Sequence, residues 1–174
     1  MYCPYCHGWE RSGLALGVLA TDEWAVHEAV HVRRFSNDVT LYTNGGSAMT
    51  DQRELLKTRD MAVRDEPLAR LDGAGTSLER LVFTDGTSAA CQALFCRPRM
   101  RQRSDLAARL GCRLLDDGAV EVNEYGQTTV LGVYAVGDMA RRADFPFPAA
   151  QLVVAAAEGT LAAVVIDQEL LYNN

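Results

Sequence analysis

The chain has 174 residues, 48% of them hydrophobic and 7% aromatic, and this composition excludes a disordered chain. Its length allows one domain or one and a half. Its formal net charge of −6 argues against a nucleic-acid partner, and the lack of an apolar run of ~18–20 residues argues against a membrane span.

The N-terminal residues, Met1-Tyr2-Cys3-Pro4, contain neither a cationic leader nor an apolar segment, so secretion is not expected. The chain has five Cys, an odd number that argues against a structural disulfide framework. We therefore expect a cytoplasmic protein in a reducing compartment.

The first motif along the chain is CPYCHG, in which Cys3 and Cys6 lie three positions apart. In the first turn of a helix this spacing brings the two sulfur atoms within reach of an unstrained disulfide, and Pro4 suits such a turn. The free N–H groups of the turn are expected to stabilise a thiolate and to lower its pKa. His7 is a candidate proton carrier because the usual pKa of histidine lies near neutrality.

Half of a zinc site is an alternative reading of the motif, and it requires two further ligands. Cys91 and Cys96 are the obvious second pair, but their spacing within one predicted strand sends the side chains to opposite faces of a sheet. An inert pair of thiols is the third possibility. Cys91, Cys96 and Cys112 are expected to be small buried apolar residues, and no metal site is assigned.

The segment after the motif has the pattern of a βαβ unit. Apolar runs at residues 14–20 and 39–43 predict two strands, and apolar residues at helical spacing over residues 23–35 predict a helix between them. This arrangement is typical of a parallel sheet. A further helix is expected from about Asp51, where Asp51 and Glu54 have capping-box spacing.

Residues 68–95 predict an antiparallel excursion. The dipeptide Asp85-Gly86, which is favoured in tight turns, separates predicted strands at 78–84 and 88–96. Ser104 can cap a short helix over 105–110 that Gly111 ends. Strands are then predicted at 118–122 and 132–136, followed by a long helix from about 149 to 171.

The segments CPYCHGWE, the βαβ unit and GVYAVGD followed by an Ala-rich helix occur in one order along nearly the whole chain. In this the chain resembles low-molecular-weight thioredoxin reductases, flavoproteins of the pyridine nucleotide-disulfide oxidoreductase class. It looks most similar to the branch with His after the second Cys, which includes fungal dithiol oxidases. The resemblance implies an α/β fold: a Rossmann-like βαβ nucleotide-binding domain (NADPH-domain-like) with an antiparallel excursion over residues 1–97, and the C-terminal portion of an FAD-binding domain over 98–174.

The resemblance also implies that Cys3 and Cys6 form a redox disulfide that exchanges electrons with a flavin. Carried over from the family, Cys6 is the charge-transfer thiolate that faces the flavin, and Cys3 is the thiol that attacks the substrate. His7 occupies the position of the family's acid/base Asp.

At the other end of the chain, Gly137 and Asp138 match the family's Gly-Asp pair. There a carboxylate accepts hydrogen bonds from the ribityl hydroxyls of FAD, and the glycine allows close approach of the backbone. A plain turn after a strand is the alternative reading. The start of the last helix, at Ala150, Gln151 and Leu152, corresponds to the family's contact with the pyrimidine edge of the flavin.

The chain departs from the family at the dinucleotide loop. The Gly-x-Gly-x-x-Gly/Ala positions carry Ala20, Asp22 and Ala25, and only the last fits. Asp22 would set a carboxylate beside the pyrophosphate, at a cost of ~1 kcal/mol in water for charges about 4 Å apart. The basic residues that hold the 2′-phosphate are replaced by Thr43-Asn44-Gly45. We therefore expect weak or no NADPH binding.

The chain also departs from the family in length, because no Rossmann half-domain for the ADP part of FAD precedes CPYC. We expect an incomplete FAD site and an exposed apolar sheet edge that another chain covers, either in a homodimer or as an N-terminal FAD-domain chain. A fragment, a mis-started reading frame, a split enzyme and a degenerate relative all fit these observations.

Taken together, these features predict a flavin-linked thiol–disulfide oxidoreductase. Its substrate would be a small dithiol or disulfide or a thioredoxin-like protein, with oxygen as an acceptor or a ferredoxin-like protein as a donor in place of NADPH. The alternative of a different class is a flavin-free α/β remnant or subunit that binds a partner. A flavin-free redox protein that uses the two cysteines alone is a third possibility.

Overall fold

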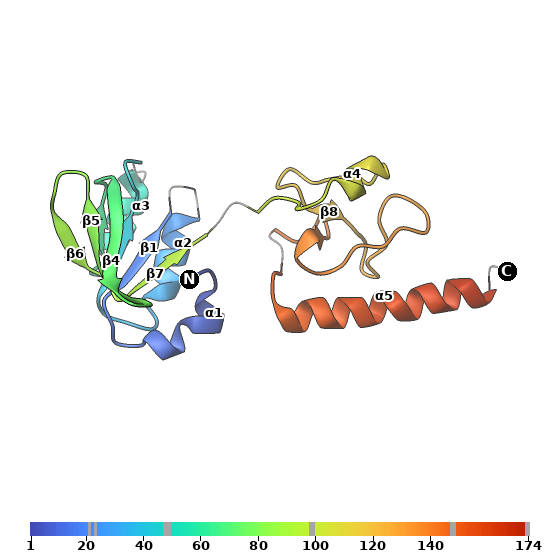
Figure 1. Cartoon of the computed structure of the whole chain (residues 1–174), viewed down its shortest axis with the longest axis horizontal. Helices are drawn as coiled ribbons and strands as arrows, with labels where there is room; N and C mark the ends of the chain where they lie inside the picture. The colour runs from blue at the N-terminus through green and yellow to red at the C-terminus, as the bar shows by residue number, and fades with distance from the viewer. Residues whose placement is uncertain (21, 23, 47–49, 98–99, 147–148, 173–174) are drawn as a thin grey trace. The chain divides into compact units, whose positions relative to one another are not determined.

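The computed structural model describes the chain except for residues 21, 23, 47–49, 98–99, 147–148 and 173–174. The chain forms two compact units, Met1–Pro98 and Arg99–Asn174 (Figure 1). Among the described residues, no helix combines the length and the apolar character that crossing a bilayer requires.

A four-stranded parallel sheet in the order β3-β2-β1-β7 forms the centre of the first unit. Its strands are β1 (Leu16–Leu19), β2 (Val39–Tyr42), β3 (Ala62–Arg64) and β7 (Ala93–Cys96). The one-turn helix α1 (Pro4–His7) and the 3-10 helix η1 (Trp9–Arg11) precede β1, while α2 (Ala25–Val32) and α3 (Thr50–Lys57) connect the next strands. The predicted βαβ unit of a parallel sheet is therefore confirmed.

Helix α2 covers one face of this sheet with four apolar residues at helical spacing, Ala25, Val26, Ala29 and Val32. They pack into a core with strand residues that include Val18, Leu41 and Phe95. The helix is shorter than the predicted 23–35, of which residue 23 lies outside the described residues. The further helix expected from about Asp51 is confirmed as α3, which begins at Thr50.

The antiparallel excursion is also confirmed, as the strands β4 (Leu68–Ala74), β5 (Ser77–Phe83) and β6 (Ser88–Ala90). Gly86 has a φ of +86° in the turn between β5 and β6, a conformation that favours glycine. Leu81 and Phe83 of β5 pack with Tyr42 and Leu94 of the parallel sheet in a second core. This antiparallel sheet therefore covers the face opposite α2.

The prediction of one strand over residues 88–96 is wrong, because the chain changes sheets at Gln92. The Gln92 N–H donates to the Ala15 carbonyl (2.7 Å), and the Gln92 Oε1 accepts from the Ala15 N–H (3.1 Å). These two bonds divide the segment into β6 and β7. Cys91 is buried at the junction. Cys91 and Cys96 therefore do not belong to one strand, and the expectation that their side chains leave opposite faces of it does not apply.

The second unit contains little regular structure besides one long helix. Its elements are α4 (Leu106–Arg109), β8 (Val120–Glu121), the 3-10 helix η2 (Gly137–Met139), β9 (Ala140–Arg141) and α5 (Leu152–Tyr172). The short helix after Ser104 is confirmed, since Ser104 Oγ accepts the Leu106 N–H (3.2 Å) and Gly111 has a φ of +84°.

Two predictions for this unit are wrong in detail. The predicted strand at 132–136 is instead a turn with one isolated bridge, between Tyr134 and Gln127. The last helix begins at Leu152, so Ala150 and Gln151 precede it rather than lie inside it.

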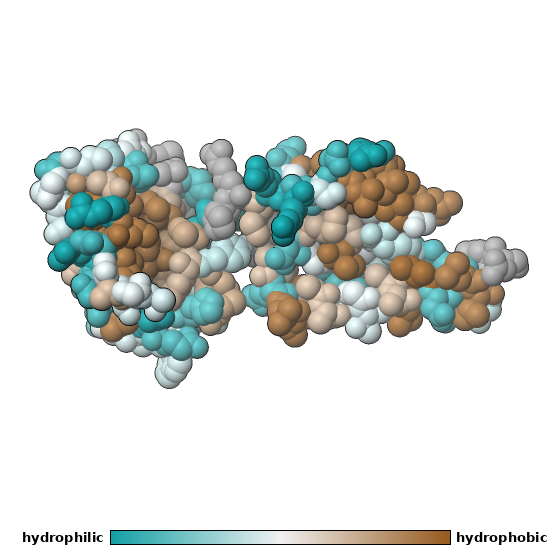
Figure 2. Space-filling view, viewed as in Figure 1, coloured by the Kyte–Doolittle hydropathy of each residue, from teal (hydrophilic) through white to brown (hydrophobic). Residues whose placement is uncertain are grey.

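Helix α5 is apolar around most of its circumference, and much of that surface is exposed. Only Ala162 is fully buried, whereas Leu152, Val153 and Val164 have exposed fractions of 90%, 72% and 55%. Apolar side chains lie on the surface along this helix (Figure 2). Helices that are apolar all round are normally buried, which indicates that α5 has a surface built to be covered.

Candidate functional site

The CPYCHG motif forms the cap and the single turn of α1. Cys3 is the N-cap residue, with an extended backbone, and Pro4 is the first helical residue. The Cys3 carbonyl accepts the N–H groups of Cys6 and His7, each at 3.2 Å. The prediction that the motif opens a helix is therefore confirmed, and both cysteines belong to the same turn.

The two cysteines are free thiols, like the other three of the chain. Cys3 is half-buried, and Cys6 and His7 are exposed. A side-chain hydrogen bond with Cys3 raises the pKa of the Cys6 thiol, and desolvation raises it further. The prediction of a lowered pKa is wrong for Cys6 in this dithiol form, because its nearest partner is a second thiol that favours the protonated state.

Backbone and packing contacts hold α1 at both ends. Upstream, the Met1 ammonium donates to the Leu94 carbonyl (2.6 Å), and the Cys96 N–H donates to the Met1 carbonyl (2.8 Å), which ties the N-terminus to β7. Downstream, Gly8 lies directly against the Phe35 ring. The dithiol is therefore attached to the parallel sheet on one side and to the end of α2 on the other.

Gly8→Ala is expected to destabilise the first unit by about 1–3 kcal/mol, because it overpacks this contact. An added Cβ would lie 2.5 Å from Phe35 Cε2 and 2.6 Å from the Pro4 carbonyl oxygen, although the helical backbone of Gly8 itself suits alanine. Urea unfolding of Gly8→Ala and of the parent chain measures the difference in stability. Gly159→Ala is the control, since its Cβ meets nothing within 4 Å; equal midpoints for Gly8→Ala and the parent chain would contradict the contact.

A row of rings along α2 reaches the motif, and it was not among the predicted site residues. The rings of Tyr5 and His31 have centroids 4.2 Å apart, and His31 lies 6.2 Å from Phe35. His27 continues the row towards Trp24. Burial, aided by His27 and Arg34, lowers the pKa of His31. The spacing of residues 24, 27, 31 and 35 is the signal that could have identified this helical face.

The dinucleotide loop follows β1, at the edge where the strand order reverses between β1 and β7. Ligands of this kind of fold bind at such a point. Here Asp22 Oδ1 accepts the Trp24 N–H (3.1 Å), and the Arg97 guanidinium lies 5.3 Å from the centroid of the Trp24 ring. The Asp22 side chain therefore occupies the Trp24 amide, and Arg97 lies beside the Trp24 ring.

Of the residues predicted to contact flavin in the second unit, Gly137 lies against helix α5. Gly137 has a φ of +71°, its N–H donates to Glu158 Oε2 (2.7 Å), and a Cβ there would lie 3.2 Å from the Ala155 Cβ. Asp138 is exposed next to it, and Leu152 begins α5. The Gly-Asp turn and the first turns of α5 are thus adjacent, and a cavity of about 360 Å³ beside them is lined by residues that include Val136, Ala149 and Val154.

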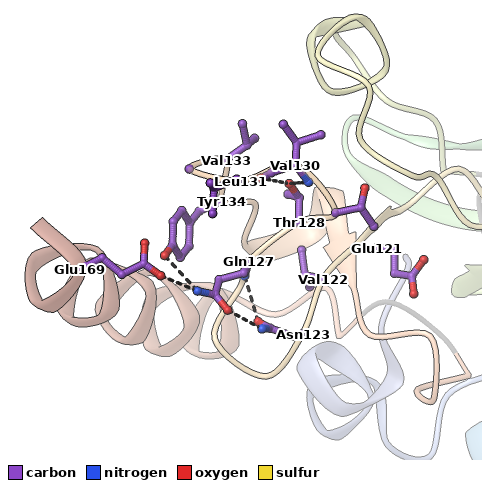
Figure 3. A pocket seen from close by; sticks show the side chains of 12 residues that line it. Glu121, Val122, Asn123, Gln127, Thr128, Val130, Leu131, Val133, Tyr134 and Glu169 are labelled. Atoms are coloured by element: carbon purple, nitrogen blue, oxygen red, sulfur yellow. Dashed lines mark hydrogen bonds between the residues drawn. The ribbon is translucent and has the colours of Figure 1, made fainter. Parts of the chain in front are cut away.

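A second cavity, of about 450 Å³, contains none of the predicted residues (Figure 3). Gln127 Nε2 donates to Glu169 Oε1 of α5 (2.7 Å) and lies 3.2 Å from the Tyr134 hydroxyl, while Asn123 Nδ2 donates to Gln127 Oε1 (2.6 Å). Burial and the hydrogen bond with Glu169 raise the pKa of Tyr134. These polar groups satisfy one another and tie the loop to α5.

The structure also bears on the alternative of a metal site. Within the described ranges, no group of three or more His, Cys, Asp or Glu side chains is arranged to hold a metal ion. Cys91 is fully buried, and burial raises the pKa of its thiol to about 11. Such a thiol is a poor nucleophile and a poor ligand at neutral pH.

Comparison with known proteins gives consistent matches. The family model for pyridine nucleotide-disulphide oxidoreductases matches residues 24–159. A thioredoxin reductase of Gibberella zeae is 31% identical over 153 residues, which cover 80% of this chain and 44% of the relative. The thioredoxin reductase tcpT of Claviceps purpurea is 31% identical over 150 residues, which cover 79% of this chain and 46% of the relative. The chain thus spans less than half the length of both.

Solved structures match over nearly the whole chain. A putative thioredoxin reductase TrxB from Bacillus anthracis superposes with a TM-score of 0.88 at 25% identity, covering 99% of this chain and 57% of that one. HlmI superposes with a TM-score of 0.87 at 34% identity, and the match covers 98% of this chain and 52% of HlmI. These matches confirm the predicted α/β fold with Rossmann-type domains.

Proposed function

Because the chain belongs to the pyridine nucleotide-disulphide oxidoreductase family, we propose that it is the dithiol-carrying part of a flavin-linked thiol–disulfide oxidoreductase, similar to a thioredoxin reductase or a dithiol oxidase. The observation that carries the proposal is the pair of free thiols Cys3 and Cys6 in one helical turn, where Cys3 raises the pKa of the Cys6 thiol. Cys6 is exposed and Cys3 is half-buried, so both residues are open to solvent, as exchange with a substrate outside the chain requires.

The proposed exchange has two steps. The Cys3 thiolate attacks a sulfur of the substrate disulfide, which breaks that S–S bond and releases the first substrate thiolate. The Cys6 thiolate then attacks the Cys3 sulfur of this mixed disulfide. The Cys3–Cys6 disulfide forms, and the second substrate thiolate is released. Two electrons pass to the substrate, and the protons lost by the two cysteines reach the two products, with His7 next to Cys6 as the proposed carrier. A small disulfide or a thioredoxin-like protein is the proposed substrate.

Residues of the second unit fit one end of FAD. The exposed carboxylate of Asp138 can accept hydrogen bonds from hydroxyls, and the segment Ala150-Gln151-Leu152 leads into the free N–H groups at the start of α5. The positive φ of Gly137 brings the backbone close to α5. A bound flavin would supply or accept the two electrons of the Cys3–Cys6 couple. This chain spans less than half the length of its curated relatives, and the proposal assigns no groups for the ADP end of FAD.

NADPH is not part of the proposal. The Asp22 carboxylate takes the Trp24 amide that a phosphate would need, and Arg97 stacks near the Trp24 ring at the same edge of the sheet. We therefore propose that electrons enter or leave through another donor or acceptor. A reducing, cytoplasmic setting fits the five free thiols and belongs to the same proposal.

Flavin binding tests this proposal. The full chain is titrated with FAD, alone and after mixing with an N-terminal FAD-domain chain of the family. We expect flavin absorbance to co-migrate with the mixed complex. Asp138→Ala should lower the affinity for FAD, because the ribityl hydroxyls lose their hydrogen-bond acceptor. A complex that forms but stays colourless would contradict the flavin assignment.

A second candidate function is partner binding without flavin, and α5 favours it. A helix with exposed Leu152, Val153 and Val164 has an apolar surface that a second chain would cover. The partner is either a second copy or the N-terminal FAD-domain chain. A colourless complex that loses its partner when Val164 is replaced by Lys would support this candidate over the first.

A further inference from the structure

Helix α1 has one turn and depends on the rest of the first unit for its conformation. A four-residue helix forms too few hydrogen bonds to be stable alone. Its ends are held by Met1 at β7 and by Gly8 at Phe35. Between these ends, the Tyr5 ring packs against His31 of α2, with centroids 4.2 Å apart and an interplanar angle of 56°.

This ring contact acts on the segment that joins the two sulfur atoms. Tyr5 lies between Cys3 and Cys6, so a rotation of Tyr5 about the helix changes how the two thiols face each other. His31 is attached to a rigid element, because its neighbours Ala29 and Val32 on α2 are fully buried in the core. A ring on a well-packed helix thus contacts a one-turn helix that is too short to be stable alone.

We propose that His31 is a positioning residue for the Cys3–Cys6 dithiol, because its contact with Tyr5 holds α1 in the conformation in which the two sulfur atoms can join. This inference rests on the proposed function, since it requires the two cysteines to form a disulfide. The formation of an intramolecular bond depends on how often the reacting atoms meet in the correct geometry. Loosening α1 therefore lowers the stability of the disulfide relative to the dithiol.

The stack does not require the histidine charge. Burial favours the neutral imidazole of His31, and the group that faces it from α1 is the Tyr5 ring. Phenylalanine at position 31 would keep a planar ring in the same place, whereas alanine would remove it. The pair of substitutions thus separates the ring contact from every role that needs a titrating nitrogen.

The experiment equilibrates the full chain with glutathione buffers. Glutathione disulfide takes two electrons from Cys3 and Cys6: their S–H bonds break, one S–S bond forms, and two glutathione thiols are produced. Trypsin releases residues 1–11, a peptide that contains Cys3 and Cys6 and no other cysteine. After alkylation, mass spectrometry of this peptide gives the fraction oxidised without interference from the three other thiols.

His31→Ala is expected to lower the equilibrium constant for disulfide formation by about 2- to 10-fold, the range for loss of one aromatic pair. A tenfold change corresponds to about 30 mV in reduction potential. His31→Phe should stay within about twofold of the parent chain. His27→Ala is the comparison variant one turn earlier on α2: its ring contacts Trp24 and His31 but not the Tyr5 ring, so it should change the constant less than His31→Ala does.

The outcomes separate the inference from the function on which it rests. If the parent chain forms the disulfide and His31→Ala leaves the potential unchanged, the positioning role is overturned and the proposed function stands. If no Cys3–Cys6 disulfide forms in the parent chain, the proposed function fails. A double-mutant cycle with Tyr5→Ala distinguishes loss of the ring contact from a general loosening of α2. If His31→Ala has the same effect in the Tyr5→Ala background as in the parent chain, the role of the stack is overturned.

Discussion

Replacing Cys6 by Ser is expected to stop disulfide exchange after its first step. In the parent chain, an aromatic disulfide reagent such as dithiobis-nitrobenzoate should release two coloured thiolates at the motif, because Cys6 displaces the first adduct from Cys3. In Cys6→Ser the adduct on Cys3 has no resolving thiol and stays in place. The peptide of residues 1–11 should then carry one nitrobenzoate group, where the parent peptide carries an internal disulfide.

Two controls make this result specific to the motif. Cys3→Ser leaves the exposed Cys6 as the single thiol of the peptide, so it too should hold one adduct. Cys96→Ser should behave like the parent chain, because position 96 ends β7 and lies outside the turn. An internal disulfide in the Cys6→Ser protein that involves Cys3 and another cysteine would contradict the pairing.

The second large effect is the absence of NADPH binding. We expect a fluorescence titration of the full chain with NADPH to show no saturation up to about 1 mM, a concentration that corresponds to ~4 kcal/mol of binding free energy. The reason is local. Asp22 presents a negative charge and occupies the Trp24 amide, and the Trp24 ring with Arg97 lies at the edge where the cofactor would bind.

Asp22→Gly is the informative variant for this prediction. It removes the charge and frees the amide, so NADPH affinity should rise by about fivefold, the equivalent of ~1 kcal/mol for one pair of like charges in water. Asp38→Gly is a charge-matched control immediately before β2, at the opposite end of the strands from the loop. Micromolar, saturable binding by the parent chain would overturn the account of the loop.

Local patterns predicted the parts of the fold that depend on neighbouring residues. Apolar runs of strand length gave β1 and β2, helical spacing gave α2, and Pro4 after Cys3 gave the turn of α1. In each case the hydrogen bonds close within the segment or with the next element of a βαβ unit. Such signals lie in the sequence itself.

Features that depend on distant residues were missed. The break at Gln92 comes from its bonds with Ala15, 77 positions away along the chain. The raised pKa of Cys6 depends on the side-chain geometry of the Cys3 thiol, which motif spacing alone does not specify. The contact between Tyr5 and His31 joins two helices that no local pattern relates. Tertiary structure decides these points.

The mass of the peptide of residues 1–11 tests the central claim most directly. The full chain is incubated with oxidised or with reduced glutathione, alkylated and digested with trypsin. The account predicts that oxidation removes two hydrogens from this peptide and blocks both alkylations, and that reduction restores them, while the buried Cys91 stays unmodified in the folded chain. If Cys3 and Cys6 are both alkylated after every treatment, they do not form a redox couple.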